Sequence, residues 1–262
     1  MMIENRMLAR MQEGQTALGL GATMPPASHM PVFVARAGFD WAFLDLEHAL
    51  ISPENLGLLC TMLRLQGVTP LVRIASGSLD RVASLLDSGA QGIILPHVET
   101  AREAQDLVAL CKYAPTGSRS WGGASPQLGY PQKPSAELMS AADATTLAIV
   151  MCESRSGVDN IDQIAAVPGL DGVLIGNVDL SLDLGETGAP DGPATTEAIL
   201  HVGRAVNAAG RHFGIAGAPS PERIRALQGL RIDFLLAGMD HRIFAAALEA
   251  RAETWRSALG SA

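Results

Sequence analysis

Short apolar runs alternate along the chain with longer segments in which apolar residues recur every three or four positions. The short runs are rich in Val, Ile and Leu and have the length of strands buried on both faces, whereas the longer segments have the period of amphipathic helices. Eight short runs occur, at residues 17–23, 41–45, 70–74, 92–96, 147–153, 172–176, 213–217 and 233–238. Strands that alternate with helices predict a parallel sheet.

The number of units predicts how that sheet is arranged. Eight strand–helix units favour an α/β fold in which a single (β/α)₈ TIM barrel spans residues 1–262 as one domain. An open, doubly wound sheet is the alternative, but no GxGxxG motif follows the first run, which disfavours a dinucleotide-binding version. Ser52-Pro53 and Ser220-Pro221 each supply a capping hydroxyl and a Pro for the first turn of a helix.

Two segments depart from this alternation. Residues 114–136 are rich in Gly, Pro and Ser and are longer than an ordinary connection, and loops of this length are usually functional or disordered. Residues 241–262 are predicted to form an amphipathic helix with Phe244, Leu248 and Trp255 among its apolar residues. That helix can pack against its own barrel or against a second chain.

Composition and charge narrow the class of protein. The chain is 48% hydrophobic and 18% charged, which is typical of a globular protein. It has no apolar run of 18 residues and no secretory signal at its start, so we expect no membrane partner and a cytoplasmic location. A net charge of −8 and the lack of a dense basic cluster disfavour nucleic-acid binding. The widely spaced Cys60, Cys111 and Cys152 are predicted to be reduced, buried thiols.

Polar residues collect where the predicted strands end, while the strand starts are mostly apolar or Gly. The active site of a (β/α)₈ barrel lies at the carboxyl ends of its strands, so these residues are candidates for chemistry. They are Asp45, Glu47, His48, Arg73, His97, Glu99, Glu153, Arg155, Asn177, Asp179, Asp240 and His241.

Glu153 and Asp179 are the candidate metal ligands. Two carboxylates from neighbouring strands, completed by waters, suit a hard divalent ion such as Mg²⁺ or Mn²⁺. The alternative is that each carboxylate caps the helix that follows it or binds a backbone amide of a loop. His97, which follows Pro96 at a strand end, can either contact the metal site or support its loop.

His48 and Arg73 are candidates for moving protons and binding oxygen atoms. The pKa of an unperturbed histidine lies near working pH, so His48 can serve as a base or as a third ligand, or only make a structural hydrogen bond. A guanidinium at a strand end can clamp a carboxylate or a carbonyl oxygen. Arg73 can instead form an ion pair with Asp45 or Glu47. Asp87, late in a predicted helix, has by itself the pattern of a surface carboxylate.

Five segments in this order resemble the HpcH/HpaI aldolase family: FDWAFLDLEH, PLVRI, LLDSGAQGIILPHVET, VMCESRSGVDNID and GLDGVLIGNVDLSLDLG. The resemblance runs from about Gly19 to Met239. It implies a class II pyruvate aldolase that acts on 4-hydroxy-2-oxoheptanedioate, 2-keto-3-deoxy sugar acids or related 4-hydroxy-2-oxo acids. The implied cofactor is a divalent metal, Mg²⁺ or Mn²⁺, with Co²⁺ and Zn²⁺ as further candidates.

The resemblance also implies roles for individual residues. Glu153 and Asp179 match the family's metal ligands, and His48 matches its base. Arg73 matches the arginine that binds the substrate, and Asp179 lies among the substrate-binding residues. Asp87 matches the acid that pairs with the histidine, a role that its own sequence context does not indicate.

The resemblance also implies how the substrate carboxylate is bound, which loop lies over the site and how the subunits assemble. The amides of Gly176, Asn177 and Val178 would receive the substrate carboxylate. The loop around Gly117 and Arg119 resembles a family loop that lies over the site. The family's assembly implies a homohexamer, a trimer of dimers, in which a C-terminal helix is exchanged between subunits.

The chain departs from the family pattern at several positions. Leu46 stands where many relatives have Gly, Asn177 where Pro is frequent, and Met151 where some carry Gln. Ser120 and Trp121 differ from the usual loop sequence. All these changes leave the ligands and the base in place. The changes at Ser120, Trp121 and Met151 bear on the acceptor aldehyde, whereas Leu46 can alter the turn or face outward.

The predicted function is therefore a metal-dependent carbon–carbon lyase that makes or cleaves 4-hydroxy-2-oxo acids. Its substrates are the enolate of pyruvate or hydroxypyruvate and an aldehyde. A Schiff-base aldolase is disfavoured because neither Lys112 nor Lys133 lies at a strand end. A citrate-lyase-β-like acyl-CoA lyase and a non-catalytic barrel that binds metal or oxo acid are the remaining alternatives.

Overall fold

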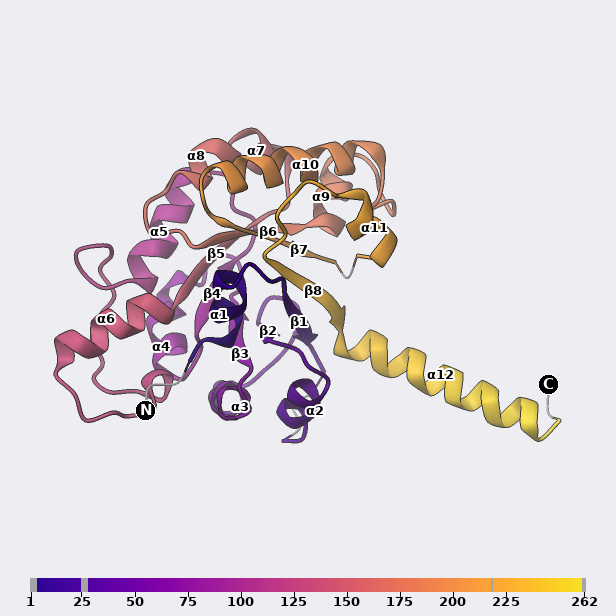
Figure 1. Cartoon of the computed structure of the whole chain (residues 1–262), viewed down its shortest axis with the longest axis horizontal. Coiled ribbons are helices and arrows are strands. Elements are labelled where there is room, and N and C mark those ends of the chain that lie inside the picture. The colour runs from indigo at the N-terminus through magenta and orange to yellow at the C-terminus, as the bar shows by residue number, and fades with distance from the viewer. Residues whose placement is uncertain (1–3, 25–27, 218, 261–262) are drawn as a thin grey trace.

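Eight parallel strands form a closed barrel in the computed structural model, which describes residues 4–24, 28–217 and 219–260 (Figure 1). The strands are β1 Ala17–Ala22, β2 Trp41–Asp45, β3 Thr69–Arg73, β4 Gly92–Leu95, β5 Leu147–Cys152, β6 Gly172–Gly176, β7 His212–Ala216 and β8 Phe234–Met239. Each strand pairs with its neighbour in the sequence, and β8 pairs with β1. The predicted (β/α)₈ barrel is confirmed, with strand ends within one or two residues of those expected.

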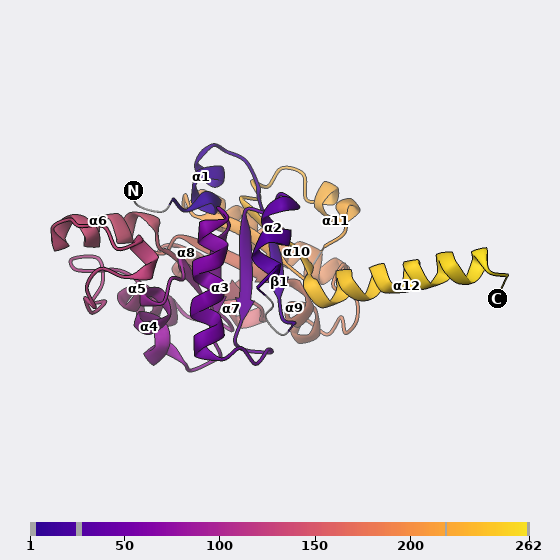
Figure 2. The same ribbon diagram turned by 90° about the horizontal axis from the view of Figure 1, so that it is seen from below.

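Helices surround the barrel on its outer side (Figure 2). They are α1 Arg6–Gln12, α2 Met30–Arg36, α3 Pro53–Leu65, α4 Val82–Asp87, α5 Ala101–Cys111, α6 Ser135–Thr145, α7 Arg155–Asp159, α8 Ile161–Ala165, α9 Asn177–Asp183, α10 Pro193–Ala208, α11 Pro221–Ala226 and α12 Asp240–Ala258. Short 3₁₀ turns span Leu79–Arg81 (η1) and Pro126–Leu128 (η2). Ser52 and Ser220 cap α3 and α11 through their side chains, as their sequence context predicts.

The interior of the barrel is packed with apolar side chains. Alternate residues of each strand point inward, among them Trp41, Phe43 and Phe234, and α1 closes the amino-terminal end with Met7. Gly19 is required beside Trp41, because a Cβ at this position would overlap the indole ring. With one end closed, the carboxyl ends of the strands are where polar side chains can meet a ligand.

The three cysteines lie in the layer between strands and helices. Cys60, Cys111 and Cys152 are all buried and unpaired, as expected. Burial raises the pKa of each thiol to about 12, so they stay protonated at neutral pH.

Among the described residues, no helix combines the length and the apolar composition that a bilayer crossing requires.

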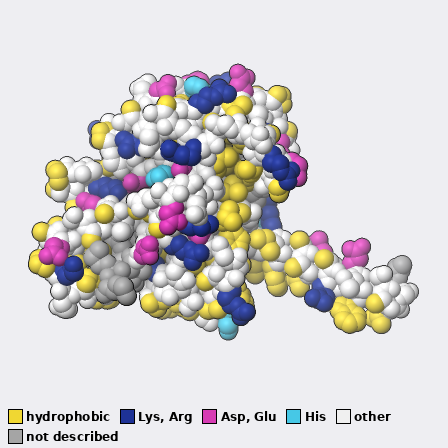
Figure 3. Space-filling view, in the orientation of Figure 1, with side chains coloured by type: hydrophobic (Ala, Val, Ile, Leu, Met, Phe, Trp, Pro, Cys, Tyr) yellow, Lys and Arg dark blue, Asp and Glu magenta, His cyan; other side chains and the backbone are white. Residues whose placement is uncertain are grey.

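Helix α12 extends away from the barrel and has no buried residue (Figure 1). Its apolar side chains include Phe244, Leu248 and Trp255, each more than half exposed. Beside the base of α12 lies an apolar groove of about 740 Å³ that is lined mainly by β1, α2 and the first turns of α12. Hydrophobic side chains gather at this junction in Figure 3. An amphipathic terminal helix is confirmed, while its exchange between subunits stays a prediction.

Candidate active site

The last inward positions of β2 and β3 carry a buried ion pair. Asp45 and Arg73 are aligned in the register of the two strands. The Arg73 guanidinium donates from Nε to Asp45 Oδ1 at 3.0 Å and from Nη2 to Oδ2 at 2.7 Å, and it lies over the ring of Phe43. Asp45 also accepts the backbone N–H groups of Glu47 and His48. This pair therefore fixes both the arginine and the start of the loop that carries the histidine.

The two partners hold each other in the charged form. Burial raises the pKa of Asp45, but the hydrogen bonds and charge of Arg73 and the two loop amides outweigh it, and the pKa lies below its ordinary value of 3.8. Burial likewise lowers the pKa of Arg73, but the hydrogen bond and charge of Asp45, followed by the charges of Glu47 and Glu153, raise this pKa above its ordinary value. The ion pair that the sequence left as an alternative for Arg73 is therefore present.

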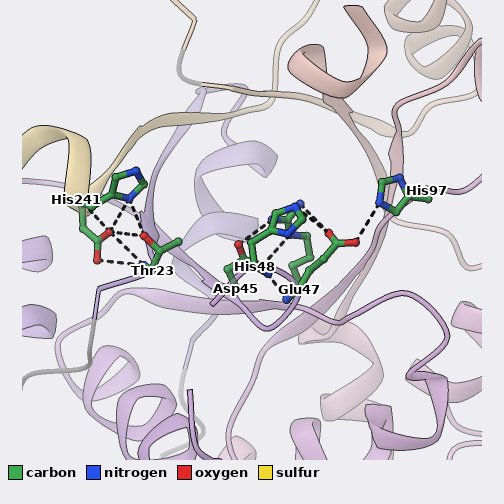
Figure 4. Close-up of polar contacts among 8 residues, drawn as sticks. Thr23, Asp45, Glu47, His48, His97 and His241 are labelled. Atoms are coloured by element: carbon green, nitrogen blue, oxygen red, sulfur yellow. Dashed lines mark hydrogen bonds and ion pairs between the residues drawn. The ribbon is translucent and has the colours of Figure 1, made fainter. Parts of the chain in front are cut away.

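Glu47 and His97 extend this network across the mouth of the barrel. Glu47 Oε2 lies 2.9 Å from Arg73 Nη1, and Glu47 Oε1 lies 3.0 Å from His97 Nε2. His97 has a positive φ of 54°, which is uncommon for a residue with a side chain. Sequence reasoning placed both residues at strand ends, named Glu47 only as a possible ion-pair partner of Arg73, and left the role of His97 open. Figure 4 shows Asp45, Glu47 and His48 close together, with His97 reaching Glu47 from the far side.

Glu153, directly after β5, is a buried carboxylate with no lysine or arginine partner in the described part of the chain. It is 3% exposed, and its Oε2 accepts the backbone N–H of His97 at 3.0 Å. Burial raises its pKa, as does the charge of Asp179, and the hydrogen bond and charge of His97 oppose this only in part. Gly176 makes room for this side chain, because a Cβ there would overlap Glu153 Oε1.

Asp179 lies in the first turn of α9, where its charge is near enough to Glu153 to raise the pKa of that carboxyl. Its carboxylate makes no hydrogen bond or ion pair with any described residue. Ser154, not Glu153, caps α7, whereas the hydrogen bond from the His97 amide to Glu153 agrees with the loop-amide alternative. Two carboxylates without a lysine or arginine partner, one of them buried, fit a divalent ion that completes its shell with water. No group of three or more His, Cys, Asp or Glu suited to a metal occurs among the described residues.

His48 is exposed at the rim of the site. Its ring is 65% exposed, and Nε2 lies 4.0 Å from Glu47 Oε2, while its backbone N–H is held by Asp45. The imidazole is therefore accessible to a substrate. The hydrogen bond of its backbone N–H to Asp45 fixes its position more than any contact of the ring does. Its role as a base stays a prediction.

The structure does not bring Asp87 to His48. Helix α4 ends at Asp87 and leads directly into the start of β4, so Asp87 lies near the amino-terminal end of the barrel. Its carboxylate accepts a hydrogen bond from Arg119 Nη2 at 2.7 Å. Arg119 also donates to Gln127 and lies over the ring of Tyr113. The expectation that the loop around Gly117 and Arg119 covers the site is wrong for the chain's own barrel, since this loop leads from α5 toward the start of β5.

The predicted substrate-binding amides lie at the start of α9. Gly176 ends β6 and precedes α9, whose start has no side-chain cap in the described part of the chain, so the first N–H groups of this helix lie at the carboxyl end of the barrel. Asn177 is 2% exposed and Val178 is 45% exposed. These positions agree with a carboxylate-binding role, which stays a prediction.

Thr23, Asp240 and His241 form a separate polar cluster at the ends of β1 and β8. Asp240 accepts the amides of Thr23 and Met24, and His241 Nδ1 lies 2.7 Å from Thr23 Oγ1. Figure 4 shows this cluster on the opposite side of Asp45 and His48 from His97. Its contacts attach the first turn of α12 to β1.

Comparison with known proteins identifies the family. The family model described as HpcH/HpaI aldolase/citrate lyase matches residues 27–220. The chain belongs to the HpcH/HpaI aldolase/citrate lyase family. It is therefore a carbon–carbon lyase of the aldolase type, and the predicted enzyme class is confirmed.

Relatives of the HpcH/HpaI chain include aldolases from a fungus and a bacterium. It is 33% identical to a 4-hydroxy-4-methyl-2-oxoglutarate aldolase of Chaetomium globosum, over 93% of this chain and 92% of the relative. It is 34% identical to a hydroxypyruvate/pyruvate aldolase of Rhizorhabdus wittichii, over 93% and 95%. The crystal structure of an HpcH/HpaI aldolase from Desulfitobacterium hafniense matches with a TM-score of 0.90 at 27% identity, covering 95% of this chain and 96% of that one.

Proposed function

We propose that the protein catalyses reversible aldol addition between the enolate of pyruvate or hydroxypyruvate and an aldehyde, with a divalent cation held by Glu153 and Asp179. The observation that carries the proposal is a buried carboxylate with a raised pKa that lies beside a second carboxylate and has no lysine or arginine partner among the described residues. The names of the aldolase relatives support the oxo-acid donor. Mg²⁺ and Mn²⁺ are the proposed ions, since both prefer oxygen ligands.

The chain's own residues bind and orient the donor. When bound, a divalent cation supplies Lewis acidity that stabilises negative charge developing on the oxo acid. Hydrogen bonds to Asp45 engage two of the five N–H groups of Arg73, and Nη1 forms an ion pair with Glu47, so N–H groups remain to donate to the developing oxyanion. The amides at the start of α9 receive the carboxylate of the oxo acid.

His48 moves the proton in this proposal. In the direction of addition, its accessible ring takes a proton from C3 of the donor and gives it to the aldehyde oxygen. In cleavage, the ring takes the proton of the C4 hydroxyl and returns it to C3. Neither lysine suits a Schiff-base route. Lys112 follows α5 and donates to the carbonyl of Thr146 just before β5, and Lys133 donates to Glu137 on α6, so neither lies at the carboxyl end of a strand.

The test is exchange of the C3 protons of pyruvate in D₂O, followed by NMR on EDTA-stripped protein. We expect exchange only after Mg²⁺ or Mn²⁺ is restored. His48→Ala is expected to slow exchange about 10²- to 10⁴-fold, because a positioned general base contributes about that much. His201→Ala on the exposed face of α10 is the matched control and should exchange like the wild type.

The absence of exchange with Mg²⁺, Mn²⁺, Co²⁺ and Zn²⁺, for both pyruvate and hydroxypyruvate, would contradict the proposed donor. An acyl-CoA thioester cleaved under the same conditions would then favour the citrate-lyase-like alternative. Metal-dependent stabilisation without any turnover would favour a binding protein. A cytoplasmic location stays a prediction.

We further propose that α12 is exchanged between subunits of a homohexamer arranged as a trimer of dimers. Helix α12 buries none of its own residues, and an apolar groove of about 740 Å³ lies at its base. Asp87 and His48 lie at opposite ends of one barrel. The family resemblance implies that Asp87 pairs with His48. This pair would therefore have to form between two subunits.

Light scattering is expected to give a mass of six copies of the 27.4 kDa chain. Trp255→Glu, on the exposed apolar face of α12, should dissociate the assembly because it places a charge in the proposed contact. Glu253→Lys, on the opposite face of the same helix, is the control. A wild-type particle of 27.4 kDa would contradict the proposal.

A further inference from the structure

The backbone of His97 is strained, and it is held by a side chain of the active site. Its φ of 54° places it in the left-handed region, which is unfavourable for a residue with a Cβ. Pro96 precedes it, and the N–H of Val98 donates to the carbonyl of Met151 on β5. The chain is thus fixed on both sides of His97. Strain of this kind tends to occur where function requires it.

The left-handed conformation directs both the amide and the ring of His97 toward the same carboxylate oxygen. The backbone N–H donates to Glu153 Oε2 at 3.0 Å, and the ring Nδ1 lies 3.4 Å from that oxygen. Glu153 Oε2 is therefore occupied, and Oε1, which lies against Gly176, is the oxygen left for a cation.

The other ring nitrogen reaches the arginine side of the site. His97 Nε2 lies 3.0 Å from Glu47 Oε1, which has no other hydrogen-bond partner among the described residues. Glu47 Oε2 in turn faces Arg73 Nη1 at 2.9 Å. One imidazole thus connects the proposed metal ligand on β5 with the arginine network on β2 and β3.

We propose that His97 is a positioning residue whose ring fixes the relative orientation of Glu153 and Glu47, and through them the cation and Arg73. This inference rests on the proposed function. The ring is 48% exposed, so it fills no core space, and both described ring contacts are carboxylates of the site. Groups that orient a ligating carboxylate in this way typically contribute about 10- to 100-fold to metal affinity.

The test is calorimetric titration of the EDTA-stripped protein with Mn²⁺, without substrate. His97→Gly is the informative variant, because Gly adopts a positive φ without strain and keeps the N–H that donates to Glu153 while losing the ring. We expect its Kd for Mn²⁺ to rise at least about tenfold. His97→Asn, which tolerates the same backbone conformation but is too short to span both carboxylates, should not restore wild-type affinity.

A Kd within about twofold of wild type in His97→Gly would overturn the proposal, as would tighter binding, whatever happens to the unfolding temperature. A purely structural role for the ring gives that result, with a changed melting temperature and unchanged affinity. A wild-type protein that neither binds Mn²⁺ nor exchanges pyruvate protons would instead refute the proposed function. The two failures are thus distinguishable.

Discussion

Glu153→Gln is expected to abolish metal-dependent pyruvate exchange and, at the same time, to make the metal-free protein more stable. Lewis-acid stabilisation is worth several kcal/mol, so loss of one of two protein ligands should slow exchange about a thousandfold or more. The amide keeps the size of the side chain beside Gly176 and removes its charge. Exchange by NMR and thermal unfolding of EDTA-stripped protein measure the two effects.

The gain in stability follows from the direction of the Glu153 pKa shift. Burial, aided by the charge of Asp179, raises this pKa in the folded protein above its ordinary value of 4.5. Ionisation therefore opposes folding as pH rises from 4.5 through the raised folded-state pKa, and the full penalty is present above it. The stability advantage of Glu153→Gln should thus vanish below pH 4.5 and be greatest at high pH.

Glu197→Gln is the matched control, because this carboxylate is exposed on α10 and its loss changes the net charge equally. It should leave exchange and the response to metal unaltered. Added Mn²⁺ should raise the melting temperature of wild type but not of Glu153→Gln. Equal stabilisation of both proteins by Mn²⁺ would refute the assignment of Glu153 as a ligand.

The strand ends that carry the chemistry were predictable because side chains alternate along a strand. Residues two apart in a strand face the same side of the sheet, so Asp45 faces inward like Phe43, and Arg73 faces inward like Leu71. The apolar core residues therefore predict which charged residues lie at the end of the barrel. The ion pair of Asp45 with Arg73 then follows from the register of two adjacent parallel strands. Glu153 is predictable in the same way as the residue after β5.

The remaining features depend on geometry that periodicity does not encode. The positive φ of His97 results from constraints on both sides of it in the folded chain, and nothing in the local sequence requires it. Asp87 and the loop around Gly117 and Arg119 were expected near the site through the family resemblance. A helix that precedes a strand ends at the amino-terminal side of a barrel, so topology alone could have placed Asp87 at the opposite end.

Arg73→Met is expected to destabilise the protein and to remove most of its activity, for two separable reasons. It leaves the buried Asp45 without its partner, and breaking a buried ion pair on one side costs about 3–5 kcal/mol. It also removes the proposed donor to the oxyanion, a loss of about 10²- to 10³-fold. Urea unfolding and pyruvate exchange at a fixed metal concentration measure the two losses.

The double variant Arg73→Met/Asp45→Asn separates the two roles. Asn at position 45 keeps an oxygen for the amides of Glu47 and His48 but carries no charge, so most of the lost stability should return. Exchange should remain as low as in Arg73→Met, because no donor to the oxyanion has been restored. Recovery of exchange together with stability would mean that Arg73 serves only to neutralise Asp45. In that case the oxyanion would have to be stabilised without it.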